Sequence, residues 1–121
     1  MRNMNWKSVL ALVLAAFFVV GGIGNILASA TILEDYRRWG FPDGFNYVTG
    51  TLELIAAVLI AWRPMRVFGA ALAAAVMTAA AGTVLFHGEF THAIAPATVL
   101  IVTLVVGVTA WRDRPASLRA A

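Results

Sequence analysis

Four apolar stretches, separated by short clusters of charge, restrict what this chain can fold into more than any other feature. Residues 8–33, between Lys7 and Glu34, contain no Asp, Glu, Lys or Arg. At about 1.5 Å per residue, a helix of this length reaches roughly 39 Å and can cross a hydrocarbon core of about 30 Å. Three more stretches have the same character apart from Glu53: residues 44–62, 67–88 and 90–111. The sequence therefore predicts a single all-α domain, residues 1–121, built as a bundle of four transmembrane helices.

The composition agrees with a membrane protein and not with a soluble one. Hydrophobic residues make up 61% of the chain and charged residues 12%, with a mean hydropathy of +0.84. A soluble domain of this size is mostly surface and needs more polar residues to cover it. The basic residues flank apolar runs and form no patch interleaved with aromatics, so nucleic-acid binding is not expected. The absence of cysteine excludes disulfides, thiolate metal sites and dithiol redox relays.

Lysine and arginine predict the orientation, because they gather on the cytoplasmic side of membrane proteins. With the N-terminus inside, only Arg37 and Arg38 lie outside, in a predicted loop at residues 34–43. The other basic residues fall on the inner side: Arg2, Lys7, Arg63, Arg66, Arg112, Arg114 and Arg119. Pro64 lies in a tight basic turn, and Pro115 closes the last helix. We expect both termini in the cytoplasm and multi-pass localisation in a cell membrane of the bacterial inner-membrane type.

The first span also resembles a secretory signal. Arg2 and Lys7 precede an apolar stretch that ends in small residues at 28–30, as at a cleavage site. However, the uncharged run is longer than the usual signal core and is interrupted by glycines and Asn25. These features favour a first span that stays attached to the protein.

Glu53 is the most informative residue in the chain. It falls about nine residues from the outer start of the second span, near the middle of the membrane. An ionisable group at that depth costs a few kcal/mol, so it usually faces the bundle interior and marks function. Two states are open to it: a protonated carboxyl group, or a carboxylate held by neighbouring donors. A structural hydrogen bond between helices is the simpler interpretation, worth about 1 kcal/mol.

Other polar residues are placed to join Glu53. Asn46, Thr49 and Glu53 recur at helical spacing and give the second span a polar face. Asn25 lies at a similar depth on the first span, in a stripe with Gly21 and Ser29, and a contact between Asn25 and Glu53 is expected. The third span, which packs through small residues such as Gly69 and Ala73, carries Thr83 and His87 on one face.

His87 is a candidate proton donor or acceptor at the mouth of an outward-facing polar pocket. Thr83 and Thr98 more often bond to carbonyl groups of their own helices, and we favour that interpretation. His87, Glu89 and His92 do not have the spacing of a helical metal-binding motif, so no metal site is predicted. The candidates for ligand binding or proton transfer are Glu53, Asn25, Thr49 and His87. No catalytic residue is predicted.

Several motifs resemble the DoxX-like family of small four-helix membrane proteins. They are GGIGN at residues 21–25, WGFP at 39–42, GTLEL at 50–54, the arginine-flanked turn at 63–66 and the glycine- and alanine-rich span that leads to His87. The resemblance covers residues 6–111, and its specificity lies in the order and spacing of the motifs. Many members have a lysine where this chain has Asn25, which here favours a neutral hydrogen bond to Glu53 or a protonated Glu53.

The resemblance implies a fold more firmly than an activity. It implies an accessory subunit of a quinone-linked or redox-stress system. Such a subunit is expected not to be an enzyme on its own. The bilayer and a membrane or redox protein are the expected partners, self-association is open, and a quinone or lipid is the expected type of ligand. Two alternatives stay open: a structural assembly factor, and a small proton-coupled transporter of lipophilic cations. Small multidrug exporters, however, place their carboxylate on the first helix, and Glu53 is on the second.

Overall fold

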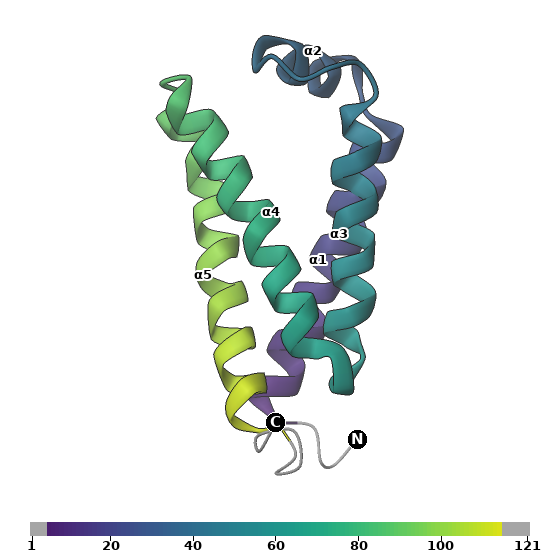
Figure 1. Cartoon of the computed structure of the whole chain (residues 1–121), viewed down its shortest axis with the longest axis vertical. Helices are drawn as coiled ribbons and strands as arrows, with labels where there is room; N and C mark the ends of the chain where they lie inside the picture. The colour runs from purple at the N-terminus through teal and green to yellow at the C-terminus, as the bar shows by residue number, and fades with distance from the viewer. Residues whose placement is uncertain (1–4, 115–121) are drawn as a thin grey trace.

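The computed structural model describes residues 5–114, and in that range the chain forms α-helices and no β-strand (Figure 1). The helices are α1 (Trp6–Leu27), α2 (Ala30–Arg38), α3 (Phe45–Ala61), α4 (Arg66–Phe86) and α5 (Phe90–Arg112), with a short 3₁₀ turn, η1 (Arg63–Met65), before α4. The prediction of an all-α fold is confirmed. Three residues used in the sequence analysis lie outside the described range: Arg2, Pro115 and Arg119.

Three segments are long and apolar enough to cross a membrane by length and composition. They are Trp6–Leu27, Arg63–Phe86 and Phe90–Arg112. The remaining apolar helix, α3, is shorter, with 17 residues. The chain is therefore a multi-pass membrane protein with at least these three candidate spans in the described residues.

The prediction of one continuous helix over residues 8–33, followed by a loop at 34–43, is wrong. α1 ends at Leu27, because Ala28 adopts φ 33° and ψ 107°, outside helical geometry. Ser29 then starts α2, and its side chain accepts a hydrogen bond from the Ile32 amide at 3.3 Å. Ser29 is thus a helix cap and not part of a stripe on the first span. Half of the predicted loop, residues 34–38, belongs to α2.

The long helices form two pairs that meet at one end. α1 lies along α3, and α4 lies along α5 (Figure 1). The pairs pack together near the α3–α4 turn and diverge toward the end where α2 crosses the bundle (Figure 1). The buried apolar core lies at the joined end and includes Ala11, Phe18, Ile60, Ala73 and Val106. The divergence leaves room for a cavity at the α2 end.

Small residues allow the close contacts that hold the pairs together. A Cβ atom on Gly50 of α3 would lie 2.7 Å from the carbonyl oxygen of Gly22 on α1, and one on Gly22 would lie 2.8 Å from that of Gly50. A Cβ on Gly69 of α4 would lie 2.6 Å from the backbone nitrogen of Ile60. The structure confirms the predicted packing role of Gly69 and Ala73, which are both buried.

Polar side chains hold the joined end of the bundle. Arg66 is buried and donates from Nε to the Ile60 carbonyl oxygen at 2.6 Å, so it satisfies a free carbonyl at the end of α3. Lys7 at the start of α1 pairs with Asp113 beyond α5 at 3.0 Å. The outward faces of the helices, in contrast, are apolar and expose residues such as Val20, Val58 and Ile101. Such faces are suited to lipid.

Candidate functional site

Glu53 lies on the face of α3 that packs against α1. It is buried, with 5% of its surface exposed. The side-chain amide of Asn25 on α1 donates to Glu53 Oε1 at 2.6 Å. A Cβ on Gly21 would lie 3.1 Å from Glu53 Oε2, so glycine leaves space for the carboxyl group. The predicted contact between Asn25 and Glu53 is confirmed.

Asn25 connects Glu53 to α2. The phenol of Tyr36 on α2 donates to Asn25 Oδ1 at 2.8 Å, and the amide of Asn25 also donates to the Gly21 carbonyl oxygen at 3.2 Å. Burial has the largest effect on the pKa of Tyr36 and raises it. A hydrogen bond with Thr49 lowers this pKa, and a negative charge on Glu53 raises it. The phenol therefore stays protonated and can donate. A chain of hydrogen bonds runs from Tyr36 through Asn25 to Glu53.

Asn46 holds the end of α1 in place beside this chain. It is buried and donates from its side-chain amide to the backbone carbonyl of Asn25 at 2.9 Å. This carbonyl lies in the last turn of α1, where no following helical residue can reach it. Asn46 thus fixes the backbone that carries the Asn25 side chain.

A cavity of about 430 Å³ lies between the diverging helix pairs, with Glu53 in its wall. Four long helices contribute to the lining, and α2 with its following loop covers one side. The polar groups on the α1–α3 side are Asn25, Tyr36, Thr49 and Glu53. The opposite side is formed by α4 and α5 and is mostly apolar, with residues such as Met77, Ala80 and Val99. Its size and composition are those of a small-molecule site.

The structure brings only some of the candidate residues to this cavity. Asn25, Thr49 and Glu53 line it, whereas His87 does not. Nδ1 of His87 lies 2.8 Å from the Thr83 carbonyl oxygen, and the side chain is exposed at the end of α4. His92, in the first turn of α5, lines the cavity in place of His87.

The threonines on α4 and α5 bond to their own helices. Thr83 donates to the Ala79 carbonyl oxygen at 2.8 Å, and Thr98 donates to that of Ile94 at 2.7 Å. This is the arrangement that the sequence analysis favoured. Within residues 5–114, no three His, Cys, Asp or Glu side chains come together as a metal site.

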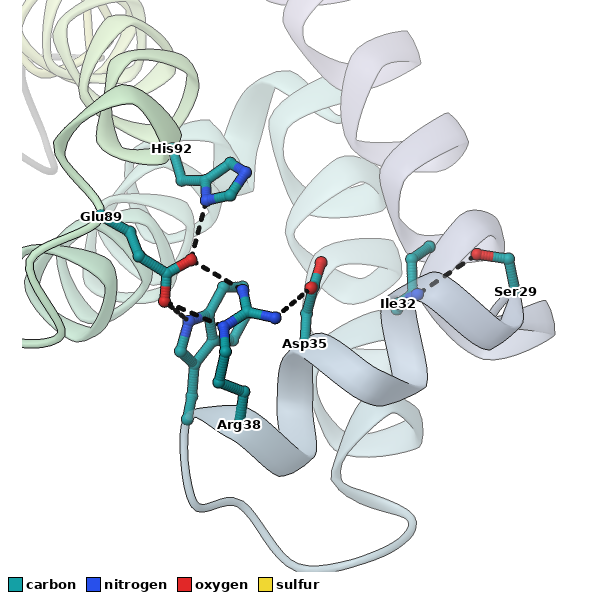
Figure 2. Close-up of polar contacts among 7 residues, drawn as sticks. Ser29, Ile32, Asp35, Arg38, Glu89 and His92 are labelled. Carbon is teal, nitrogen blue, oxygen red and sulfur yellow. Dashed lines mark hydrogen bonds and ion pairs between the residues drawn. The ribbon is translucent and has the colours of Figure 1, made fainter.

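A second polar cluster, which we call the α2 latch, joins α2 to the α4–α5 turn. It consists of Asp35, Arg38, Trp39, Glu89 and His92. Arg38 donates to both oxygens of Glu89, at 2.7 and 3.2 Å, and to Asp35 at 2.8 Å. Trp39 donates to Glu89 Oε2 at 2.8 Å, and Nδ1 of His92 lies 2.8 Å from Oε1. Figure 2 shows Glu89 between Arg38 and His92, with Asp35 on the far side of the guanidinium group.

The hydrogen bonds of the α2 latch shift the pKa values of its charged groups. The hydrogen bonds from Arg38, Trp39 and His92 lower the pKa of Glu89 to about 2, with that from Arg38 contributing most. The same pair raises the pKa of Arg38. Trp39 and His92 also line the cavity, so the latch borders the cavity on the side of α2 and the α4–α5 turn.

Acid is expected to open the α2 latch. Since the folded-state pKa of Glu89 is lowered from 4.5, its contribution is complete above about pH 4.5 and is lost as the pH falls toward about 2. Spin labels on cysteines at the exposed positions Glu34 and Thr91 should give one narrow distance distribution at pH 6. The distribution should broaden to longer distances between pH 4.5 and 2.

The matched control is Glu89→Gln in the same labelled protein. The distance distribution of this variant should already be broad at pH 6 and should not change in acid. A distribution that is narrow at every pH in both proteins would show that the ion pair does not hold α2 to the α4–α5 turn.

The sequence analysis missed Tyr36, Trp39 and Phe41 as cavity residues. Residues 34–43 were expected to form a loop, so the sequence analysis gave Tyr36 no place in the site and used Trp39 only within a family motif. It considered Arg38 only for the orientation and Glu89 only for a metal-binding motif. They are 51 residues apart, and no local pattern connects them. A helical reading of residues 30–38 would have placed Ile32, Leu33 and Tyr36 on one face and drawn attention to Tyr36.

Comparison with known proteins identifies the family. A profile of the DoxX-like family matches residues 9–106, which include both Asn25 and Glu53. Searches among curated proteins and among solved structures gave no match. The profile covers most of the chain and agrees with the motifs and with the apolar helices. The chain belongs to the DoxX-like family, a family of small membrane proteins.

Proposed function

We propose that the protein spans the membrane four times, with the joined end of the bundle in the cytoplasm. α3 is about 25 Å long at 1.5 Å per residue, and flanking residues and slight thinning of the bilayer extend its reach. It lies along α1, which supports a membrane position for both helices. Among the described residues, the basic side chains at the joined end are Lys7, Arg63, Arg66, Arg112 and Arg114, whereas those at the α2 end are Arg37 and Arg38. This distribution favours a cell membrane of the inner-membrane type with α2 outside.

The proposed function is to bind an amphiphilic molecule in the outer half of the bundle. The observation that carries this proposal is the cavity of about 430 Å³ with one polar wall at Glu53 and an apolar wall on α4 and α5. A polar head can meet Glu53 and Thr49 while an apolar body lies against Met77 and Val99. Quinones and lipids have such a polar head and apolar body. The protein then serves as an accessory subunit that presents such a molecule to a membrane or redox partner.

Replacing Glu53 with leucine tests this site. Decylubiquinone, a neutral quinone, is titrated into the protein in lipid nanodiscs. Glu53→Leu should weaken binding about three- to tenfold, which corresponds to the loss of one hydrogen bond worth about 0.5–1.5 kcal/mol. Glu53→Gln should bind nearly as well as the wild type, because its amide keeps the bond with Asn25 and can still donate.

Glu34→Leu is the control, since Glu34 is exposed on α2 and does not line the cavity. It should bind decylubiquinone like the wild type. Circular dichroism of each variant checks that the bundle is folded. Equal affinities for the wild type and Glu53→Leu, both folded, would reject the cavity as the binding site.

A further inference from the structure

The charges around the cavity are unbalanced. No lysine or arginine is among the described residues that line it, and Glu53 is its acidic residue. The other titratable lining groups are Tyr36, a donor to Asn25, and His92, which contacts Glu89 at the outer end. From α1 and α4, only uncharged residues face the cavity. The nearby cations are already paired: Arg37 with Asp43, and Arg38 with Asp35 and Glu89.

Aromatic rings from α2, its following loop and α3 line the cavity together with Glu53. Tyr36 makes edge contacts with Trp39 and Phe41, with ring centroids 6.0 and 5.8 Å apart, and Phe41 stacks on Phe45 at 4.5 Å. All four rings line the cavity, and Tyr36 reaches Glu53 through Asn25. The Trp39 ring already receives the guanidinium group of Arg38, 5.4 Å from its centroid. Aromatic faces and a desolvated carboxylate together are the chemistry that attracts organic cations.

In this cavity Glu53 has two states of low energy: protonated, or ionised and paired with a cation. Oε1 accepts one hydrogen bond, from an uncharged amide. An ionised Glu53 thus lacks a positive partner among the lining residues, and an isolated charge in an apolar site costs several kcal/mol. Either a proton neutralises the group, or a cation brought by the ligand does so.

We infer that the cavity binds lipophilic organic cations, quaternary ammonium or pyridinium in type, in exchange for a proton on Glu53. This rests on the proposed function of the cavity as a ligand site and specifies the head group. In the exchange, the O–H bond of the Glu53 carboxyl group breaks and the proton passes to water. The carboxylate pairs with the cation, while the apolar body of the ligand lies between the aromatic side and α4. Charge is conserved, and no oxidant or reductant is needed.

Calorimetry with a matched pair of probes tests this inference. N-methyl-4-phenylpyridinium is the cation, and 4-methylbiphenyl is a neutral molecule of nearly the same shape. Titration of the protein in nanodiscs, in two buffers of different ionisation enthalpy, counts the protons released. The cation should bind at least tenfold more tightly than the neutral probe and release close to one proton. Its affinity should rise with pH until Glu53 is ionised without ligand.

Variants of Glu53 separate this inference from the proposed function. Glu53→Gln should lose at least tenfold in affinity for the cation and release no proton, yet keep its affinity for decylubiquinone. Glu34→Gln, on the outer surface, should behave like the wild type. If the two probes bind equally, or if the cation binds without release of a proton, the exchange is wrong even where decylubiquinone binds. If neither decylubiquinone nor the cation binds, both proposals fail.

Discussion

Gly50→Ala should destabilise the bundle by about 1–3 kcal/mol, a large effect for one methyl group. The added Cβ would lie 2.7 Å from both the Gly22 carbonyl oxygen and a side-chain carbon of Ile26, and 3.2 Å from the Ile26 amide nitrogen. Backbone atoms cannot move aside as the end of a flexible side chain can. α1 and α3 must therefore separate. Reversible unfolding in mixed detergent micelles measures the change in the free energy of unfolding.

Gly82→Ala is the matched control on α4, because a Cβ there meets no atom within 4 Å. It should leave stability unchanged or raise it by about 0.5–1 kcal/mol, as expected for alanine in place of glycine within a helix. Separation of α1 from α3 would also move Asn25 away from Glu53, so Gly50→Ala should weaken ligand binding as well. Equal stabilities of the two variants would mean that the Gly22–Gly50 contact is not a close backbone contact.

The contact between Asn25 and Glu53 could be predicted because both residues lie on long apolar helices that run in opposite directions. In such a pair, depth follows from counting residues inward from a shared end at 1.5 Å per residue. The glycine positions also indicate which faces of the two helices meet: Gly21 and Gly22 on α1 contact Glu53 and Gly50 on α3. Helical periodicity and depth along the two helices therefore predicted the Asn25–Glu53 contact at the polar centre of the site.

The part of the site that α2 forms could not be predicted, because nothing in the local sequence indicated that helix. The break after Leu27 falls at Ala28, a residue that favours helix and here has a positive φ. Local propensity gave no warning of the break. α2 is held by tertiary contacts, through Tyr36 to Asn25 and through Arg38 to Glu89, over separations of 11 and 51 residues.

The choice between His87 and His92 shows how sensitive such predictions are to the exact end of a helix. Both lie beside the α4–α5 turn, and Gly88 with φ 74° reverses the chain between them. His87 caps the end of α4, and its ring contacts the Thr83 carbonyl oxygen of that helix, whereas His92 lies in the first turn of α5 and reaches the cavity.

Glu53 should be the carboxyl group that reacts with dicyclohexylcarbodiimide, a hydrophobic reagent. The reagent partitions into lipid and adds across its C=N bond to a protonated carboxyl group, with no leaving group. Glu53 is buried within the apolar bundle, whereas Glu34 is exposed on α2 and Glu89 is paired with Arg38. Labelling should therefore fall almost entirely on Glu53, and N-methyl-4-phenylpyridinium should suppress it.

The most direct test of the central claim, that Glu53 is a ligand-accessible carboxyl group inside the membrane, is peptide mass mapping after this reaction in native membranes. We expect the adduct on Glu53, its loss in Glu53→Gln, and its suppression by the cation or by decylubiquinone. Glu53 without an adduct while Glu34 and Glu89 are modified, or an adduct on Glu53 that neither ligand suppresses, would contradict the claim.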